Sequence, residues 1–328
     1  MTSTAASKVQ KYVFPAFLAM AALALTGASC DKATVSPVEA EQVVTAIDKA
    51  EGKTPAAADQ DQAGAAKAVP AAAPAEPVSG VDVGALDEAK KQRFYALSDT
   101  LQSPCGKAHS LRTSLAEDQA CKRGPFAARY VLELLADEAT DAEVKEVYEA
   151  KYKPADTNKT FQLDGVPYSG APDAPVKVVE FYDYGCPSCK QFAPVLAEAM
   201  SAFPSDAVLF YKQFPLPGHQ YSKGAAQAAL AAAKQDKFAE MHAILFAKAP
   251  YHRKPELLGY AKSLGLDLAR FEADMEAVLP RVEAEIVEGD AAGVNGTPTT
   301  FINGRTYEGP MHPKYIRLWI EEELAVNR

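Results

Sequence analysis

The strongest constraint on the fold is a short stretch in the second half of the chain, FYDYGCPSCKQF (181–192), in which two cysteines three residues apart follow an apolar run. The run before them, VKVVEFY, is rich in β-branched and aromatic residues, as expected for a buried strand. Pro187 is well tolerated as the first residue of a helix, because the N–H that proline lacks would be unpaired there anyway. The stretch therefore predicts a strand that leads directly into a helix, with Cys186 at the helix N-cap and Cys189 one turn inside.

This placement favours redox chemistry at the two cysteines. The free amides and partial positive charge of a helix start stabilise a thiolate, so we expect the pKa of Cys186 to lie well below the usual cysteine value of about 8.5. Cys186 is then the exposed nucleophile, and Cys189 is close enough to form and break a disulfide with it. A structural zinc site takes four Cys or His ligands, yet the chain has no second CxxC and its five histidines are scattered. We therefore expect no metal, and we prefer a redox pair to a purely structural staple.

The second half of the chain alternates short strands with long helices. Strands are expected at TFQLD (160–164), 176–184, 208–214 and 299–303, and helical stretches at KGAAQAALAAAKQ, KFAEMHAILFAKA, PELLGYAKSLG, LARFEADMEAVL, RVEAEIVEGDAAG and HPKYIRLWIEEELA. A strand–helix–strand unit, a helical insertion, a hairpin and a closing helix together make a thioredoxin-type α/β plan. For residues 160–328 the sequence thus predicts a thioredoxin fold with an inserted helical subdomain.

A second motif, GVNGTPTTFING (293–304), supports this plan. In a thioredoxin-type fold, a proline just before a strand and facing the CxxC adopts a cis peptide bond, and here that bond is Thr297-Pro298. Only about 5% of X-Pro bonds in folded proteins are cis, so an ordinary trans turn is the alternative. Because both motifs occur in the expected order, we expect the cis form. The backbone of Thr297 and Pro298 would then bind an extended substrate segment beside the sulfurs.

Residues 85–155 have a different pattern, in which apolar residues recur three and four apart, as in ALDEAKKQRFYALSDTL and FAARYVLELLADE. We expect a small helical module that precedes the α/β domain. A bond between Cys105 and Cys121 would close a loop of about 15 residues and stabilise the module by about 3 kcal/mol. A structural disulfide is the preferred interpretation. A redox relay to Cys186 is the alternative, because Pro104-Cys105-Gly106 at the start of a helix would be a reactive environment.

Residues 1–30 have the pattern of a secretory signal, in which two lysines precede an apolar segment (13–25) that is followed by small residues. The ending GASC, followed by Asp31, resembles a bacterial lipoprotein signal with Cys30 as the lipidated residue. It departs from the usual pattern because Gly27 stands where leucine is common. Cleavage by ordinary signal peptidase and an uncleaved anchor are the alternatives. We expect an exported protein that is lipid-anchored to the inner membrane and faces the periplasm. In that oxidising compartment, cysteines are expected to be paired or catalytic.

Residues 31–84 consist mainly of Ala, Pro, Glu and small polar residues, with almost no aromatic side chains. Such a composition buries too little apolar surface to offset the entropy of ordering, so this segment is predicted to be a disordered tether. The whole chain has a net charge of −9 and a pI of about 5.2. Because nucleic-acid binding requires a basic surface, nucleic acid is not expected as a partner.

Three segments, EFYDYGCPSC, FPLPGHQYSKGAAQAALAAAKQDKFAEMH and GVNGTPTTFING, resemble the DsbA-like branch of the thioredoxin superfamily. The resemblance covers about residues 160–328, half of the chain. It implies thiol–disulfide exchange on unfolded or partly folded exported proteins, no bound cofactor, and a membrane redox partner that resets the dithiol. It does not indicate the oligomeric state.

The resemblance implies a role near the cysteine pair for two charged residues, because of their positions in the sequence. Glu180 matches the buried acid near the cysteine pair of the family, and Lys212 on the next strand is expected to pair with it. A buried carboxylate there exchanges the proton of Cys189 through a water molecule, as a general acid–base catalyst does. Ordinary strand-surface charges are the alternative for both residues. The dipeptide Pro187-Ser188 departs from the Pro-His of the strongest oxidases, which removes one contribution to a low thiol pKa.

Together these features predict a protein disulfide oxidoreductase that forms disulfides in exported proteins through Cys186 and Cys189. Two alternatives remain open at this level. The first is a reductase or isomerase of the same fold, which would hold Cys186 reduced at rest. The second is a chaperone-like binding lipoprotein whose cysteines have no redox role. His219 and His242 are interpreted as a surface or capping residue and a core-edge residue, respectively.

Overall fold

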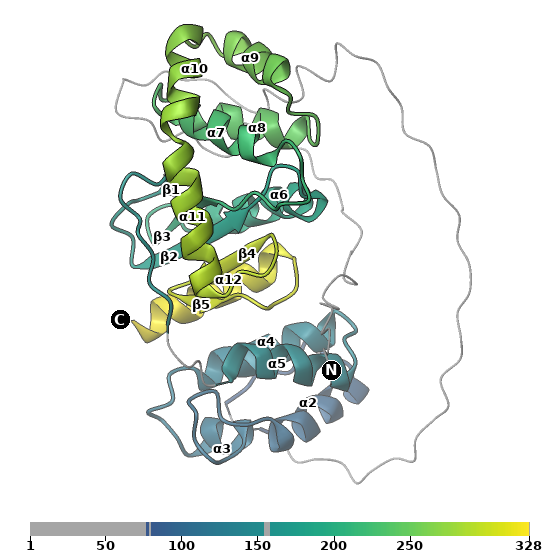
Figure 1. The fold of residues 1–328 in the computed structure, drawn as a ribbon. Helices are drawn as coiled ribbons and strands as arrows, with labels where there is room; N and C mark the ends of the chain where they lie inside the picture. Colours follow the sequence, from purple (N-terminus) through teal and green to yellow (C-terminus); the bar gives the residue numbers. More distant parts are fainter. Residues whose placement is uncertain (1–76, 79, 154–157, 328) are drawn as a thin grey trace, which may run out of the picture. The chain divides into compact units, whose positions relative to one another are not determined.

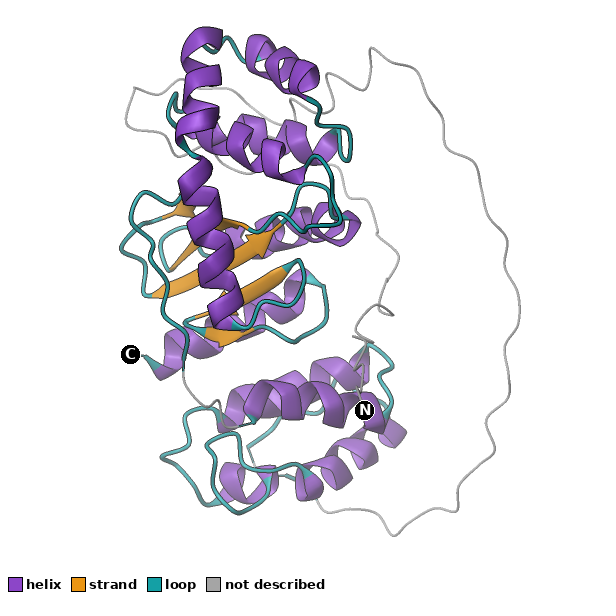
Figure 2. Ribbon diagram, viewed as in Figure 1, coloured by secondary structure: helices purple, strands orange, loops and turns teal. Residues whose placement is uncertain are grey.

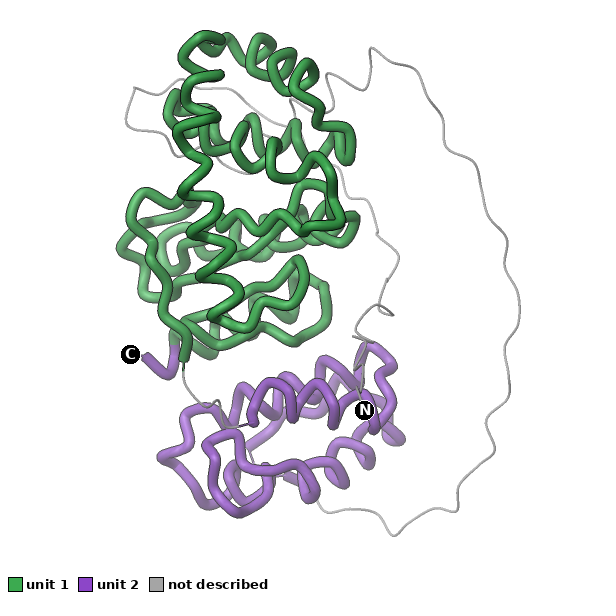
Figure 3. The backbone as a smooth tube through the Cα atoms, in the orientation of Figure 1, with its two compact units in different colours: residues 1–37, 158–324 green, residues 38–157, 325–328 purple. Residues whose placement is uncertain are grey.

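The computed structural model describes residues 77–78, 80–153 and 158–327. The expected signal sequence, Cys30 and nearly all of the expected tether lie outside the described residues. The chain divides into two compact units, one within Val38–Thr157 and one at Asn158–Leu324 (Figure 3). No helix among the described residues is long and apolar enough to cross a membrane.

The first unit contains four helices within its described part: α2 (Glu88–Thr100), α3 (Leu111–Ala116), α4 (Gly124–Ala136) and α5 (Asp141–Tyr152). Side-chain caps define where several of them begin. Asp87 accepts a hydrogen bond from the backbone of Lys90, and Thr140 and Glu143 form a reciprocal capping box. The aromatic side chains of Phe94, Tyr130 and Tyr148 are fully buried between the helices. Val78 is buried as well, although it lies inside the segment expected to be a tether.

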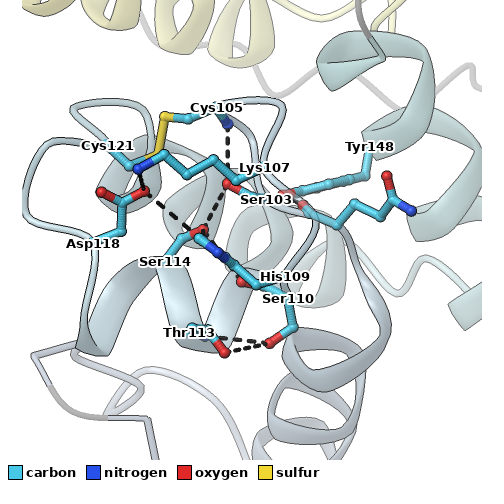
Figure 4. Close-up of polar contacts among 11 residues, drawn as sticks. Ser103, Cys105, Lys107, His109, Ser110, Thr113, Ser114, Asp118, Cys121 and Tyr148 are labelled. Carbon is cyan, nitrogen blue, oxygen red and sulfur yellow. Dashed lines mark hydrogen bonds and ion pairs between the residues drawn. A yellow bond between two sulfur atoms is a disulfide. The ribbon is translucent and has the colours of Figure 1, made fainter.

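A disulfide between Cys105 and Cys121 joins the loops on either side of α3, with the two Cα atoms 5.8 Å apart (Figure 4). Cys105 does not open a helix, because residues 101–110 form the α2–α3 loop, with a bridge between Gln102 and Ser110. Polar contacts hold this loop: the Cys105 N–H donates to Ser103 Oγ (3.3 Å). The reactive environment expected for Cys105 at a helix start is therefore absent.

The second unit contains a five-stranded sheet in the order β1-β3-β2-β4-β5. The strands are β1 (Tyr168–Gly170), β2 (Val176–Tyr182), β3 (Ala207–Gln213), β4 (Thr299–Ile302) and β5 (Arg305–Thr306). β2 and β3 are parallel, and the other pairings are antiparallel. The parallel pair requires a crossover, which α6 (Pro187–Ser201) provides.

One expected strand is wrong. TFQLD (160–164) is not a strand, and that edge of the sheet is β1, which begins four residues after this segment and which the sequence analysis missed. Phe161 in the segment is partly buried in another way, because its ring packs 5.4 Å from that of Phe181 and 4.9 Å from that of Phe301. The Gln162 N–H donates to the side chain of Glu288 (2.6 Å) and not to a neighbouring strand.

Helices cover both faces of the sheet. In Figures 1 and 2, α11 (Leu279–Ala292) crosses in front of the strands, and α6 and α12 (Pro313–Val326) lie behind them. The inserted subdomain consists of α7 (Ser222–Ala233), α8 (Phe238–Ala247), α9 (Lys254–Ser263) and α10 (Leu268–Ala277), and it extends from one end of the sheet region. The alanine-rich α7 is buried along nearly its whole length, because small side chains allow close packing with its neighbours.

Alternation along β2 separates two environments. Val179 and Phe181 belong to an apolar cluster with residues of β3, β4 and α11. Tyr182 belongs to a different cluster, which includes Cys186, Cys189 and residues of the inserted subdomain. Because side chains alternate along a strand, Glu180 shares the face of Tyr182. The sheet face that carries Glu180 is therefore the one that packs toward the two cysteines.

The Cys105–Cys121 bond closes a loop with a sequence separation of 16 residues. The double variant Cys105→Ala/Cys121→Ala is expected to lower the stability of the helical unit by about 3 kcal/mol, because the unfolded chain regains loop entropy. Denaturant unfolding of the full chain, followed by hydrogen exchange in each unit, measures this effect. Protection of the α/β domain is expected to stay unchanged, and equal loss in both units would contradict a local role for the disulfide.

Candidate active site

Cys186 is the N-cap residue of α6, with an extended backbone conformation (φ −83°, ψ 120°), and Pro187 is the first residue of the helix. Cys189 lies in the first turn and is completely buried. The expected junction of strand, N-cap and helix is therefore present. The expectation of an exposed Cys186 is wrong, because only 7% of its surface is accessible. The Cys186 thiol lies 3.3 Å from the carbonyl oxygen of Thr297, to which it donates, so the 297–298 segment covers it.

The two sulfurs differ strongly in acidity. A hydrogen bond from Cys189 lowers the pKa of Cys186 to about 5, with further lowering from Thr297 and from the backbone N–H groups of Cys189 and Ser188, while burial opposes the shift. Burial raises the pKa of Cys189 far above its usual value, and its hydrogen bond to Cys186 adds to this. One sulfur is thus stabilised as a thiolate and its neighbour as a thiol.

The peptide bond Thr297-Pro298 is cis, as the sequence predicted. A second cis bond, Ala249-Pro250, was not predicted. The Thr297 hydroxyl oxygen is buried and has no hydrogen-bond partner among the described residues. The contact of Thr297 with the reactive sulfur is therefore made by its carbonyl group.

Glu180 is buried, with 1% of its surface exposed. Its Oε1 atom has no hydrogen-bond partner within the part of the chain that the structure describes. Burial raises the pKa of Glu180 to about 8, because no neighbouring positive charge compensates the ionised form. Its partners across the sheet are Tyr211 on β3 and Thr300 on β4. Near neutral pH the Glu180 carboxyl group is therefore mostly protonated, and it loses its proton at a slightly higher pH.

Lys212 does not pair with Glu180, and this expectation is wrong. In the parallel register Lys212 lies opposite Phe181, so its side chain extends from the other sheet face. There its ammonium group donates to the carbonyl oxygen of Gln162 (2.6 Å) and forms an ion pair with Glu288 of α11. The sheet therefore separates Lys212 from the two cysteines.

A buried polar network lies on the face of Glu180. The Tyr184 hydroxyl contacts the hydroxyl of Tyr182 (3.0 Å) and Nδ1 of His242 on α8 (2.9 Å). The amide of Gln213 donates to Tyr182 Oη (2.5 Å). Burial lowers the pKa of His242 to about 3, so this imidazole is neutral near pH 7. The network fixes the strand end that precedes Cys186 and links it to the inserted subdomain.

The residues that sequence reasoning missed are Asp183 and His219. In the sequence analysis Asp183 is assigned no role, and His219 is interpreted as a surface or capping histidine. The structure brings them together: Asp183 Oδ2 lies 2.5 Å from His219 Nδ1. The Asp183 carboxylate is inaccessible to solvent. The position of Asp183 three residues before a CxxC was a usable signal, whereas nothing local marks His219, which is 36 residues further on.

The described residues contain no group of three or more His, Cys, Asp or Glu side chains that could hold a metal ion. The site instead consists of two inequivalent sulfurs, a backbone segment at Thr297 and a buried carboxyl group at Glu180. These groups support acid–base and nucleophilic sulfur chemistry.

Comparison with known proteins agrees with this geometry. Residues 163–322 match the model of a thioredoxin family. The fold and the dithiol at a helix start define a thioredoxin-fold domain, which confirms the fold predicted from the sequence. This domain, about half of the chain, belongs to the thioredoxin family.

Several solved structures are similar to this domain. A thioredoxin-like oxidoreductase from Silicibacter pomeroyi is 32% identical, with 47% of this chain and 88% of that chain covered and a TM-score of 0.42. Oxidised BdbD from Bacillus subtilis is 28% identical, with 50% and 95% covered and a TM-score of 0.46. The catalytic domain of Proteus mirabilis ScsC is 26% identical, with 59% and 98% covered and a TM-score of 0.44.

Curated relatives share the same region within much longer proteins. The Na(+)/H(+) antiporter NhaA 3 of Salinispora tropica is 41% identical over 145 residues, which cover 43% of this chain and 22% of that protein. The antiporter NhaA of Herminiimonas arsenicoxydans is 33% identical over 154 residues, or 46% of this chain and 24% of that protein. The chain thus spans about a quarter of the length of these relatives.

The raised pKa of Glu180 predicts a pH-dependent change in stability. With a folded pKa of about 8 and an ordinary unfolded value of 4.5, the folded state binds more protons between these values, so stability falls as pH rises through this window. The variant Glu180→Gln removes this loss. It is expected to gain stability relative to the parent chain as pH rises from about 5 to about 8, by up to a few kcal/mol. Denaturant unfolding across this range measures the difference, and parallel curves would contradict it.

The hydrogen bond between the sulfurs predicts how Cys186 titrates. In the reduced protein, the alkylation rate of Cys186 is expected to rise with pH around a midpoint near 5. Cys189→Ala removes the main stabilising donor and is expected to move the midpoint toward the ordinary cysteine value, whereas Cys189→Ser keeps a donor and moves it less. Iodoacetamide labelling followed by mass spectrometry measures both. An unchanged midpoint in Cys189→Ala would contradict the assigned cause.

Proposed function

We propose that the chain is a thiol–disulfide oxidoreductase that forms disulfides in exported proteins through Cys186 and Cys189. The observation that carries this proposal is the split in acidity between two sulfurs at one helix start, where the pKa of one is lowered to about 5 and that of the other is raised. A structural pair of thiols has no need of such a difference. An exchange enzyme requires it, because one sulfur must attack and leave readily.

The reaction begins from the Cys186–Cys189 disulfide. A substrate thiolate attacks the Cys186 sulfur, a bond forms between these two sulfurs, and Cys189 leaves as a thiolate that takes up a proton. The second substrate thiolate then attacks the substrate sulfur of the mixed disulfide and expels Cys186 as a thiolate. The substrate has lost two electrons and the two enzyme sulfurs have gained them. The low pKa of Cys186 makes it a good leaving group in this second step.

The same low pKa supports the oxidising direction. A stabilised Cys186 thiolate stabilises the reduced enzyme, and this raises the reduction potential of the pair. The Pro-Ser dipeptide between the cysteines lacks the histidine of the strongest oxidases, but the Cys189 thiol, Thr297 and two backbone N–H groups lower the pKa of Cys186 in its place. A reductase or isomerase of the same fold is the rival within this class.

Glu180 is the proposed proton exchanger for Cys189. Its pKa of about 8 lets it accept and return a proton near neutral pH, and it lies on the sheet face that packs toward the cysteines. Transfer would pass through a water molecule. Lys212 has no part in this proposal, because it extends from the opposite face.

Substrate is proposed to bind beside Cys186 along the backbone of Thr297 and Pro298. The Thr297 carbonyl oxygen already accepts a hydrogen bond from the Cys186 thiol, so an extended peptide pairing with this segment would meet the reactive sulfur directly. The proposed substrates are unfolded or partly folded exported proteins. We further propose that a membrane redox partner reoxidises the dithiol, and that lipidation at Cys30 holds the protein at the periplasmic side of the inner membrane.

Separate substitution of the two cysteines tests this function with a reduced, unfolded model substrate. Cys186→Ser is expected to abolish disulfide formation, because no nucleophilic sulfur remains accessible. Cys189→Ala is expected to accumulate a mixed disulfide through Cys186 in a redox buffer. Equilibration of the parent protein with glutathione then gives the direction: a potential near about −120 mV indicates an oxidase, and one near about −270 mV a reductase. Full turnover by Cys186→Ser would overturn the proposal.

A further inference from the structure

The Asp183 carboxylate, which lies next to the dithiol, makes three hydrogen-bonding contacts. Its side chain is fully buried. Oδ1 accepts a hydrogen bond from the Gly185 N–H (2.7 Å), and Oδ2 accepts one from the Leu216 N–H (3.0 Å). Oδ2 also lies 2.5 Å from His219 Nδ1. Because a carboxylate oxygen can only accept, the proton of this bond belongs to the Nδ1 atom of His219.

The backbone of the same residue touches both cysteines. The Asp183 N–H donates to the sulfur of Cys189 at 3.5 Å. The Asp183 carbonyl oxygen accepts a hydrogen bond from the N–H of Cys186 at 3.1 Å. Any shift of the Asp183 side chain therefore reaches the sulfur of Cys189 and the backbone of Cys186 through one short turn.

His219 reaches Asp183 from the loop between β3 and α7, where its side chain remains 31% exposed. This loop packs tightly on the turn before Cys186. A Cβ atom on Gly185 would lie 2.4 Å from Ser222 Oγ and 3.0 Å from His219 Cβ, so only glycine fits there. The loop is thus fixed against the turn, and the contact between His219 and Asp183 is part of a close-packed junction.

A second histidine near the carboxylate does not replace His219. His252, in the segment after α8, is 2% exposed, and neither of its ring nitrogens has a hydrogen-bond partner among the described residues. Burial lowers the pKa of His252. A neutral ring without a hydrogen bond to the carboxylate compensates its charge poorly. His219 is the side chain that donates to it.

We propose that His219 is a positioning residue of the dithiol, which acts by donating its Nδ1 proton to the buried Asp183 carboxylate. The bond holds the turn that contacts both cysteines, and it offsets a buried negative charge that would otherwise oppose the Cys186 thiolate. Without the donor, the thiolate becomes less favourable, so the pKa of Cys186 rises. The reduced protein is then less stable relative to the oxidised one, and the reduction potential falls. The inference rests on the proposed function only for its consequence in turnover.

The test compares donors at position 219. An Asn amide nitrogen can take the place of Nδ1, whereas a Gln amide nitrogen is displaced toward the position of Nε2. We expect His219→Gln and His219→Ala to raise the pKa of Cys186 by about one unit, and His219→Asn to stay close to the parent value. Thiolate ultraviolet absorbance against pH measures this in the full-length reduced protein. The glutathione potential is expected to fall in the first two variants only.

Repeating the His219 substitution in the Asp183→Asn variant distinguishes an effect of the Asp183 charge from an effect of packing. In Asp183→Asn the buried charge is gone, so adding His219→Ala is expected to leave the pKa of Cys186 unchanged. Lys234→Ala, which breaks the ion pair between Lys234, the C-cap residue of α7, and Asp274 of α10, is the matched control and is expected to titrate like the parent. Equal pKa values in His219→Gln and His219→Asn, or a full shift in the Asp183→Asn background, would overturn the inference.

These readouts are independent of turnover. If the parent protein fails to oxidise substrate while the titrations behave as expected, the proposed function fails and the role of His219 stands. If turnover is as proposed but the position-219 variants titrate like the parent, only the inference fails. Circular dichroism and thermal unfolding of each variant show whether it is folded. The comparison of His219→Asn with His219→Gln is the one that changes packing least.

Discussion

The structure of the α/β domain depends on one junction, where β2 ends and α6 begins. At this point a buried strand ends, and the N-cap residue of the next helix, Cys186, carries the reactive sulfur at the partially positive end of that helix. Every feature of the site is arranged around it. The 297–298 segment covers Cys186, and the turn at Asp183 contacts the sulfur of Cys189 and the backbone N–H of Cys186. The inserted subdomain encloses the tyrosines that precede the two cysteines.

The two cysteines at this junction differ strongly in acidity. Cys186 and Cys189 are three residues apart, yet one is at the helix end with several donors and the other is fully enclosed. Burial favours the neutral form of every ionisable group, so Cys189, Glu180 and His242 are all shifted toward neutrality. Hydrogen bonds to the Cys186 sulfur outweigh burial at that single position. The contrast arises because the donors converge where the helix begins.

Particular residues show how far sequence reasoning reaches. The N-cap position of Cys186 follows from a local pattern, since it is encoded within a few neighbouring residues. The cis bond at Pro298 follows from two motifs that occur in the expected order along the chain. The strand predicted at 160–164 is wrong because Phe161 is partly buried by ring contacts with Phe181 and Phe301 and not by strand pairing. The pairing of Glu180 with Lys212 fails because strand register, which no single strand encodes, places them on opposite faces.

The sequence by itself determined the class of chemistry, since a dithiol between a buried strand and a helix start has few other uses. It also determined the two-part organisation of the described chain, because the periodicity of apolar residues changes between the helical unit and the α/β domain. Only the tertiary structure decided how accessible Cys186 is, that Glu180 Oε1 has no hydrogen-bond partner among the described residues, and that Asp183 contacts His219. These properties depend on segments far apart in the chain, and burial and charge compensation exist only once those segments have packed together.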